Sequence, residues 1–297
     1  MSAEVTLPAV RELDVELPHG ITLRCRAAGV GRVRALLLHG FPEAAFVWDE
    51  VMQRLAPGIA TLAPNLRGYA GSSAPAQAEA YKARAVLADL VALIERLGAP
   101  VDLLVAHDWG GALAWSLAAQ RPELLRRLLI VNAPHPAAFL RELRDNPRQI
   151  EASAYMNFLG RADAAERLAE DDYARLWPFF GRPDWLTPAV RDRYREAWGH
   201  GLQGPVAYYR MSPLKPARSP QDPVATLQLP DAAVTVQVPT DVLWGEADHA
   251  LLPGLLEGLE HWVPDLRVER VPEASHWIVH EQPARVVAAI RRALGRG

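Results

Sequence analysis

The sequence predicts an α/β protein: a mostly parallel eight-stranded sheet flanked by helices, with an inserted helical cap. Three observations support this prediction. Short apolar runs such as residues 35–39, 101–105 and 128–131 are typical of strands buried on both faces. These runs alternate with helical patterns, which implies right-handed crossovers and a mainly parallel sheet. Strand signals then stop across residues 136–235 and resume afterwards, which indicates the inserted cap.

The predicted elements follow in order along the chain. Residues 12–18 alternate polar and apolar side chains and a turn leads into residues 21–26, so the two segments predict an antiparallel hairpin at a sheet edge. In helix 81–97, apolar residues recur every three or four positions and form one face. The other expected strands are 35–39, 59–63, 101–105, 128–131, 241–244 and 266–271, and the other expected helices of the core are 47–55, 110–120, 253–262 and 283–294.

The chain divides into two predicted domains. Residues 1–135 and 236–297 form the core domain, and residues 136–235 form the cap over the carboxyl ends of the strands. The cap segment is rich in prolines and aromatic residues. We expect most of these aromatic side chains to pack against one another and a minority to line a mostly apolar pocket.

The composition of the chain indicates which binding partners and which cellular compartment to expect. The 297 residues carry a formal net charge of −3, so nothing indicates binding to nucleic acid or to an anionic membrane. The single cysteine, Cys25, excludes an internal disulfide framework and fits a reducing compartment. Neither a signal peptide at the N-terminus nor an apolar run of membrane-spanning length is visible. We therefore expect a cytoplasmic protein, and the sequence leaves open whether it is a homodimer.

The central motif is the segment 101–120. An apolar strand runs into Ala106-His107-Asp108-Trp109-Gly110, and a helical pattern follows. A strand, a tight turn with small residues around a reactive side chain and then a helix are the layout of a nucleophile elbow. The residue at the apex is Asp108 where such turns usually carry Ser. The alternative for this segment alone is a simple turn in which Asp108 caps the helix.

Two further loops supply partners for Asp108. Asp248 follows the strand 241–244, and His276 lies between the last strand and the last helix. The carboxyl ends of strands are where open α/β sheets bind ligands, and nucleophile, acid and histidine occur here in the order of a hydrolase triad. Taken together, these positions favour catalysis over chance.

The chain resembles the epoxide hydrolases of the α/β-hydrolase fold, which are related to haloalkane dehalogenases. The resemblance runs from about residue 10 to the C-terminus. The motifs that carry it are His39-Gly40-Phe41-Pro42-Glu43, Arg67-Gly68-Tyr69-Ala70-Gly71-Ser72, His107-Asp108-Trp109-Gly110-Gly111, Trp244-Gly245-Glu246-Ala247-Asp248 and Ser275-His276-Trp277 followed by Glu281-Gln282-Pro283.

An Asp nucleophile implies a two-step mechanism. Its carboxylate is already ionised near neutral pH, so Asp108 can attack an sp³ carbon directly and form an alkyl ester. His276, oriented by Asp248, then deprotonates a water that attacks the ester carbonyl. The backbone N–H groups of Phe41 and Trp109 are the expected oxyanion hole. No metal-ligand cluster or phosphate-binding loop is apparent, so we expect no metal and no cofactor besides water.

Epoxide opening leaves an alkoxide, and related epoxide hydrolases protonate it with two cap tyrosines. Tyr155 matches the early tyrosine motif and Tyr209 the late one, although Met211 replaces the usual Asn and leaves Tyr208 as an alternative to Tyr209. The resemblance thus predicts conversion of a small-molecule epoxide to a vicinal diol. The side chains expected to line the substrate pocket are Phe41, Trp109, Phe158, Trp177 and Trp277.

Two other functions remain open on the sequence. A haloalkane dehalogenase would share Asp108, Asp248 and His276, but it often carries an Asn for the halide where this chain has Phe41. A non-catalytic, ligand-binding protein of the same fold is a second alternative, against which the intact triad argues. The preferred epoxide and the stereochemistry are not determined by the sequence.

Overall fold

The computed structural model describes residues 8–295, so the segment 1–7, on which the expectation about a signal peptide rests, lies outside the described residues. Eight strands form one sheet in the order β1-β2-β4-β3-β5-β6-β7-β8. The pairs β1–β2 and β2–β4 are antiparallel, and the other five pairs are parallel. The strands are β1 (Arg11–Glu16), β2 (Thr22–Ala28), β3 (Ala35–Leu38), β4 (Thr61–Pro64), β5 (Leu103–His107), β6 (Leu128–Val131), β7 (Thr240–Gly245) and β8 (Leu266–Val271). The predicted mostly parallel sheet with its edge hairpin is confirmed.

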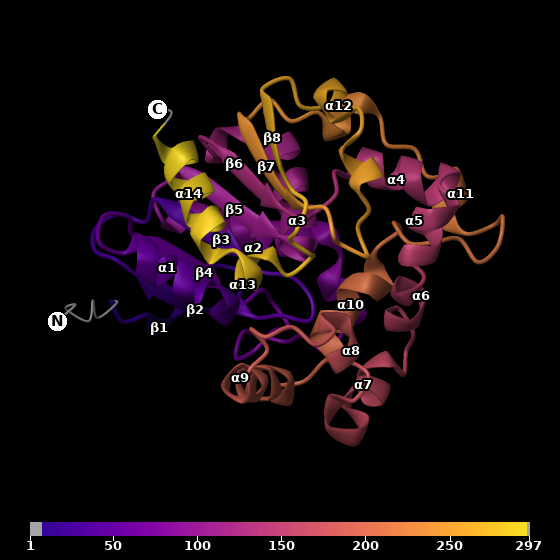
Figure 1. Cartoon of the computed structure of the whole chain (residues 1–297), viewed down its shortest axis with the longest axis horizontal. Coiled ribbons are helices and arrows are strands. Elements are labelled where there is room, and N and C mark those ends of the chain that lie inside the picture. The colour runs from indigo at the N-terminus through magenta and orange to yellow at the C-terminus, as the bar shows by residue number, and fades with distance from the viewer. Residues whose placement is uncertain (1–7, 296–297) are drawn as a thin grey trace.

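Helices cover both faces of the sheet (Figure 1). Helices α1 (Asp49–Leu55) and α14 (Pro283–Leu294) pack against each other on one face. Helices α2 (Ala83–Arg96) and α3 (Asp108–Gln120) pack on the opposite face. Every residue of the central strands β3, β5 and β6 is buried, because a parallel strand between two helical layers has no face in water. Because helices cover both faces of these strands, their sequences are continuous apolar runs.

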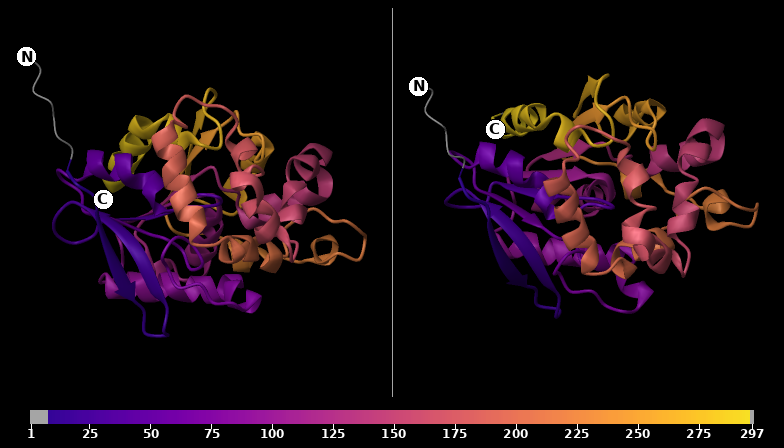
Figure 2. Two further views of the ribbon diagram at one scale, coloured as in Figure 1. Left: turned by 90° about the horizontal axis from the view of Figure 1, so that it is seen from below. Right: turned by 60° about the horizontal axis from the view of Figure 1, so that its bottom comes forward.

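The chain between β6 and β7 consists of helices with no strand. They form a separate layer beside the carboxyl ends of the strands, drawn in pink and orange in Figures 1 and 2. The helices are α4 (Pro136–Asp145), α5 (Pro147–Ala152), α6 (Tyr155–Leu159), α7 (Ala164–Tyr173), α8 (Trp177–Phe180), α9 (Pro188–Gly199), α10 (Gln203–Met211), α11 (Pro223–Thr226) and α12 (Asp231–Val234). The short helix α13 (Ile278–Glu281) follows β8.

One expected helix is wrong. The segment 253–262 holds only two short 3₁₀ turns, Pro253–Leu256 and Leu259–His261, which Gly258 separates in a left-handed conformation with a φ of 71°. The guanidinium of Arg141, on α4, donates to the carbonyl oxygens of Gly254 at 3.0 Å and Glu257 at 2.8 Å. The side chain of Arg141 thus ties these two carbonyl oxygens to the inserted segment.

Among the described residues, no helix combines the length and the apolar composition needed to cross a membrane.

Candidate active site

Asp108 stands at the junction of β5 and α3 with a φ of 49°, a left-handed conformation that is strained for a residue with a side chain. The turn needs small neighbours. A Cβ atom on Gly40 would lie 2.1 Å from Asp108 Oδ1, and one on Gly110 would lie 2.6 Å from the carbonyl oxygen of His39. The glycines predicted to surround the nucleophile thus allow the loop after β3 and the start of α3 to approach the carboxylate closely.

The structure brings the three predicted triad residues together. His276 Nδ1 lies 2.7 Å from Asp248 Oδ2, and His276 Nε2 lies 3.7 Å from Asp108 Oδ2. Asp108 follows β5, Asp248 follows β7 and His276 follows β8, so parallel strands deliver all three side chains to one edge of the sheet. The imidazole lies between the two carboxylates and can exchange a proton on the side of Asp108.

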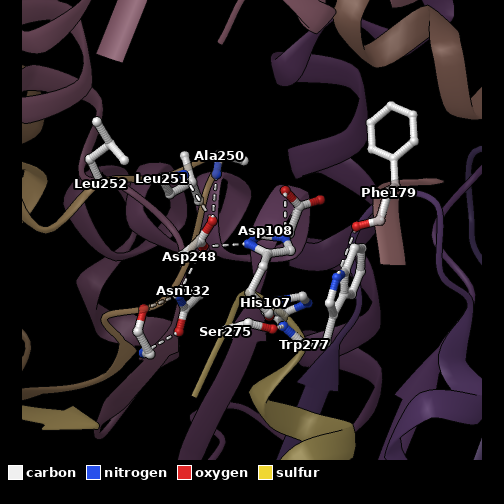
Figure 3. A network of polar contacts seen from close by, with 12 residues as sticks. His107, Asp108, Asn132, Phe179, Asp248, Ala250, Leu251, Leu252, Ser275 and Trp277 are labelled. Carbon is white, nitrogen blue, oxygen red and sulfur yellow. Dashed lines mark hydrogen bonds and ion pairs between the residues drawn. The ribbon is translucent and has the colours of Figure 1, made fainter. Parts of the chain in front are cut away.

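Asp248 is held by more donors than the sequence indicated. The backbone N–H groups of Ala250 and Leu251 donate to Oδ1 at 2.8 and 2.9 Å, and Asn132 Nδ2 donates to Oδ2 at 2.9 Å (Figure 3). Burial alone would raise the pKa of Asp248, but His276 and these hydrogen bonds lower it. The carboxylate therefore stays ionised and fixed, which orients the imidazole.

The same charges act on His276. Burial opposes the imidazolium form, but the attraction of Asp248, and then of Asp108, raises the pKa of His276 to about 9. The imidazole is consequently protonated near neutral pH while both carboxylates are charged. Loss of the charge on Asp108, as in an ester, removes one of the attractions that raise this pKa.

One of the two expected oxyanion donors already contacts the nucleophile. The backbone N–H of Phe41 donates to Asp108 Oδ1 at 2.7 Å. Trp109 follows the nucleophile in the first turn of α3, where backbone N–H groups have no partner within the helix. The backbone N–H groups at the N-terminus of α3 and in the loop after β3 thus point toward the carboxylate of Asp108.

Tyr155 and Tyr209 come from α6 and α10 and lie above the nucleophile. Their ring centroids are 6.1 Å apart, and the Tyr209 ring packs edge-on against Phe41 and Trp109. Burial, together with the negative charge of Asp108, raises the pKa of both phenols, so each keeps its proton. The hydroxyl of Tyr208 instead donates to the carbonyl oxygen of Arg67 at 3.0 Å. This geometry favours Tyr209 over Tyr208 as a group that faces the site.

Two cavities meet at Asp108, Tyr155 and Tyr209. The first, of about 290 Å³, lies on the side of Trp109 and is lined almost entirely by apolar side chains, among them Phe139, Met156, Leu214 and Leu229. The second, of about 410 Å³, lies on the side of His276 and includes Phe41, Phe179 and Trp277 together with the polar groups of Arg182, His249 and Glu281.

Two of the aromatic residues expected in the pocket line neither of these cavities. Trp177 packs against Trp198 with ring centroids 4.7 Å apart, and the guanidinium of Arg191 lies 4.7 Å from its ring. Phe158 packs at the edge of the hydrophobic core. Both residues therefore pack against other side chains, as the sequence predicts for most aromatic residues of the inserted helical segment.

Sequence reasoning missed Asn132 as a partner of Asp248. It directly follows β6, so the rule that selected the other strand ends also applied to it. Its φ is 38°, and Asn is one of the few residues that tolerate this conformation. Within residues 8–295, no group of His, Cys, Asp and Glu side chains is arranged to hold a metal ion.

The sheet, the strained nucleophile turn and the three strand-end side chains define a hydrolase of the α/β type. Comparisons with known proteins agree. A family model described as "alpha/beta hydrolase fold" matches residues 36–283. The AB hydrolase superfamily protein YfhM of Bacillus subtilis is 34% identical over 90% of this chain and 92% of its own. Epoxide hydrolase 3 of Xenopus tropicalis is 34% identical over 86% of this chain and 70% of its own.

Solved structures point to the same family. The crystal structure of the Bacillus megaterium epoxide hydrolase in complex with an inhibitor superposes with a TM-score of 0.86 at 30% identity, over 95% of this chain and 100% of that one. The chain belongs to the epoxide hydrolase family of α/β hydrolases.

Proposed function

We propose that the protein converts an epoxide and water to a vicinal diol through an alkyl ester on Asp108. The observation that carries the proposal is that a nucleophile, a base and two acids lie around the carboxylate of Asp108. Asp108 Oδ2 lies 3.7 Å from His276 Nε2, and the protonated phenols of Tyr155 and Tyr209 line both cavities that open onto Asp108. A nucleophile, a base and two acids therefore converge at one place.

In the first step, an Asp108 oxygen forms a bond to one epoxide carbon, and the bond from that carbon to the ring oxygen breaks. The electron pair goes to the ring oxygen, which takes a proton from Tyr155 or Tyr209. Both phenols have a raised pKa, so a phenolate formed in this step takes up a proton again. The imidazolium of His276, which no longer faces the charge of Asp108, supplies that proton and becomes the neutral base. The product is a hydroxyalkyl ester that contains every atom of the epoxide.

In the second step, His276 removes a proton from water, and the resulting oxygen nucleophile attacks the carboxyl carbon of Asp108. The negative charge that develops on the carboxyl oxygen is stabilised by the N–H of Phe41, which lies 2.7 Å from Oδ1, and by the N–H of Trp109. When this intermediate collapses, the bond to the diol oxygen breaks and that oxygen takes the proton that His276 holds. The Asp108 carboxyl then passes its proton to His276, which restores the carboxylate and the imidazolium. Asp248 stabilises the imidazolium formed on the way.

The leaving group separates this proposal from dehalogenation. A halide departs as a weak base that needs no proton, whereas an alkoxide does need one. Two phenols held in their protonated form beside Asp108 suit the alkoxide. Phe41, at the position where many dehalogenases have Asn, offers no side-chain donor to a halide.

The test is a single-turnover experiment with a His276→Gln variant. Without the base, the ester should persist, and intact-protein mass spectrometry after incubation with styrene oxide should show an increase equal to the whole substrate. A bromoalkane would instead add its alkyl group without the halogen. The variant that also carries Asp108→Asn is the control and should show no adduct. An epoxide adduct that survives in this control, or formation of an adduct only from the bromoalkane, refutes the proposal.

A further inference from the structure

A hydrogen bond from the inserted segment reaches the loop that carries the oxyanion donor Phe41. The indole N–H of Trp198, on α9, donates to the backbone carbonyl oxygen of Pro42 at 2.6 Å, and this contact is buried. The side chain of Trp198 belongs to the core and is only 4% exposed. Pro42 directly follows Phe41, whose own N–H donates to Asp108 Oδ1 at 2.7 Å. A side chain of the inserted segment thus binds the loop that contacts the nucleophile.

Two peptide groups connect this indole to the nucleophile. The carbonyl of Pro42 belongs to the same peptide group as the N–H of Glu43, and that N–H donates to the carbonyl oxygen of Gly40 at 3.1 Å. The Gly40 carbonyl in turn shares its peptide group with the N–H of Phe41. The hydrogen bonds therefore run in one direction, from the indole through two peptide groups to the carboxylate of Asp108.

Such a chain both orients and strengthens its last donor. Each of the two peptide groups is held at its oxygen and at its nitrogen, so neither can rotate freely. A peptide group that accepts a hydrogen bond at its oxygen also becomes a stronger donor at its nitrogen. From this geometry, we infer that Trp198 is a positioning residue: its indole N–H orients the Phe41 amide and strengthens the hydrogen bond from that amide to Asp108. The catalytic part of this inference rests on the proposed function.

The indole itself is held firmly where it makes this contact. Its ring packs against the rings of Trp177 and Tyr194, with centroids 4.7 and 5.4 Å apart. Tyr194 lies four positions before Trp198, so both side chains lie on the same face of α9. Large rings packed closely in a protein interior have few alternative orientations. The N–H of Trp198 therefore points at Pro42 without a further loss of side-chain freedom.

The hydrogen bond from Phe41 affects the two steps differently. Because this N–H occupies Oδ1 of Asp108, Oδ2 is the oxygen that attacks the epoxide, and Oδ1 becomes the carbonyl oxygen of the ester. The carboxylate charge that the N–H stabilises is lost when the ester forms, so the hydrogen bond does not favour the first step. A full charge then develops on Oδ1 in the second step, and the same N–H stabilises it. A weaker donor should slow hydrolysis of the ester without slowing its formation.

The hydrogen-bond chain is tested without substrate, by replacing Trp198 with Phe. Protein labelled with ¹⁵N at its six phenylalanines is examined by NMR, and the Phe41 amide is identified by its loss in a Phe41→Leu variant. In Trp198→Phe we expect the Phe41 amide proton to move upfield and to exchange faster with solvent, because its hydrogen bond is weaker. An unmoved and equally protected Phe41 amide overturns the inference.

A second variant separates the N–H from the ring. Benzothienylalanine at position 198 has sulfur in place of the indole N–H and keeps the two-ring shape of Trp198. It should therefore shift the Phe41 amide in the same direction as Trp198→Phe does. If the amide behaves as in the unmodified protein, the ring and not its N–H is responsible, and the inference is wrong.

The matched control is Trp177→Phe. Trp177 packs against Trp198 and lines neither cavity at Asp108, and its indole N–H donates to the carbonyl oxygen of Asp172 at 2.9 Å, within the inserted segment. The control thus makes the same chemical change among the same rings without touching Pro42. We expect the Phe41 amide and both reaction rates to match those of the unmodified protein. An equal effect in both variants would mean that lost packing, and not the hydrogen bond, acts on the site.

The catalytic consequence is measured in a single turnover with styrene oxide, followed by rapid-quench mass spectrometry. Removing an oxyanion donor outright costs about 10²- to 10³-fold, and Trp198→Phe only weakens one, so ester hydrolysis should slow by about 5- to 10-fold. Ester formation should not slow. An equal loss in both steps overturns the role of Trp198 in the second step. If the unmodified protein forms no ester, the proposed function fails, and the NMR readout still decides whether Trp198 acts on Phe41.

Discussion

Replacing Tyr209 by Phe isolates the acid for epoxide opening, and the adjacent Tyr208 provides a matched control. Phe keeps the ring contacts of Tyr209 with Phe41 and Trp109, at centroid distances of 5.2 and 5.0 Å, and removes only the hydroxyl. A positioned general acid contributes roughly 10²- to 10⁴-fold to a rate. Because Tyr155 remains, we expect ester formation to slow by about 10- to 100-fold in Tyr209→Phe, and by the full factor when Tyr155→Phe is added.

The control, Tyr208→Phe, should lower the stability of the protein and leave the rate of ester formation unchanged. Tyr208→Phe loses the hydrogen bond to the carbonyl oxygen of Arg67, which costs about 1 kcal/mol and lowers the melting temperature by about 2 °C. Its rate of ester formation should stay close to that of the unmodified protein. Stopped-flow mixing with styrene oxide measures ester formation, and circular dichroism measures melting. A slow Tyr208→Phe beside a fast Tyr209→Phe would reverse the assignment of the acid.

Three further predictions concern residues that surround or hold the two carboxylates of the site. Asn132→Ala removes a hydrogen bond to Asp248 and two to the backbone of Gly245, at 2.7 and 3.1 Å, so the free energy of unfolding should fall by about 3–5 kcal/mol in a denaturant titration. Gly40→Ala puts a Cβ atom 2.1 Å from Asp108 Oδ1, so the alkylation assay should show loss of adduct formation. The raised pKa of His276 contributes stability below about pH 6.5 that is lost as the pH rises through about 9, so His276→Gln should flatten the alkaline decline of the melting temperature.

The parts of the structure that the sequence predicts are those set by local periodicity and strand order. Asp108, Asp248 and His276 could be assigned to one site because parallel strands end at a common edge, wherever the intervening chain goes. The same logic could have identified Asn132, the residue directly after β6. What determines its role is a φ of 38° and a contact 116 positions away, and neither is visible in the local pattern.

The remaining differences come from contacts between distant segments. The expected helix at 253–262 is divided into two short 3₁₀ turns, and Arg141 of the inserted segment donates to the carbonyl oxygens of Gly254 and Glu257 there. Trp177 packs against Trp198 and guanidinium groups, because an aromatic ring in a helical cap has many neighbours besides a substrate pocket. The side chain of His107 contacts Glu43 and the backbone carbonyl oxygen of His276, which are 64 and 169 positions away in the sequence. Residue types near a motif predict the chemistry, but the packing and hydrogen-bond partners of each side chain are determined by the fold.

We expect the substrate and the water to reach Asp108 from different sides, through the two cavities that meet there. His276 lines the cavity of about 410 Å³, which is the more polar of the two, and is absent from the lining of the apolar one, whereas Asp108, Tyr155 and Tyr209 line both. We therefore expect the apolar cavity to bind the substituent of the epoxide and the more polar one to give water access to His276.

The same substitution can be placed in either cavity, since Ala112 lines the apolar one and Ala250 the polar one. Ala112→Leu should slow ester formation, with a larger effect for bulky epoxides, and leave hydrolysis of the ester unchanged. Ala250→Leu keeps the backbone N–H that binds Asp248 and should slow hydrolysis, so that the alkyl-enzyme accumulates. Rapid-quench mass spectrometry resolves the two steps. If both variants impair the same step, the two cavities are one undivided site and the separate access of water is wrong.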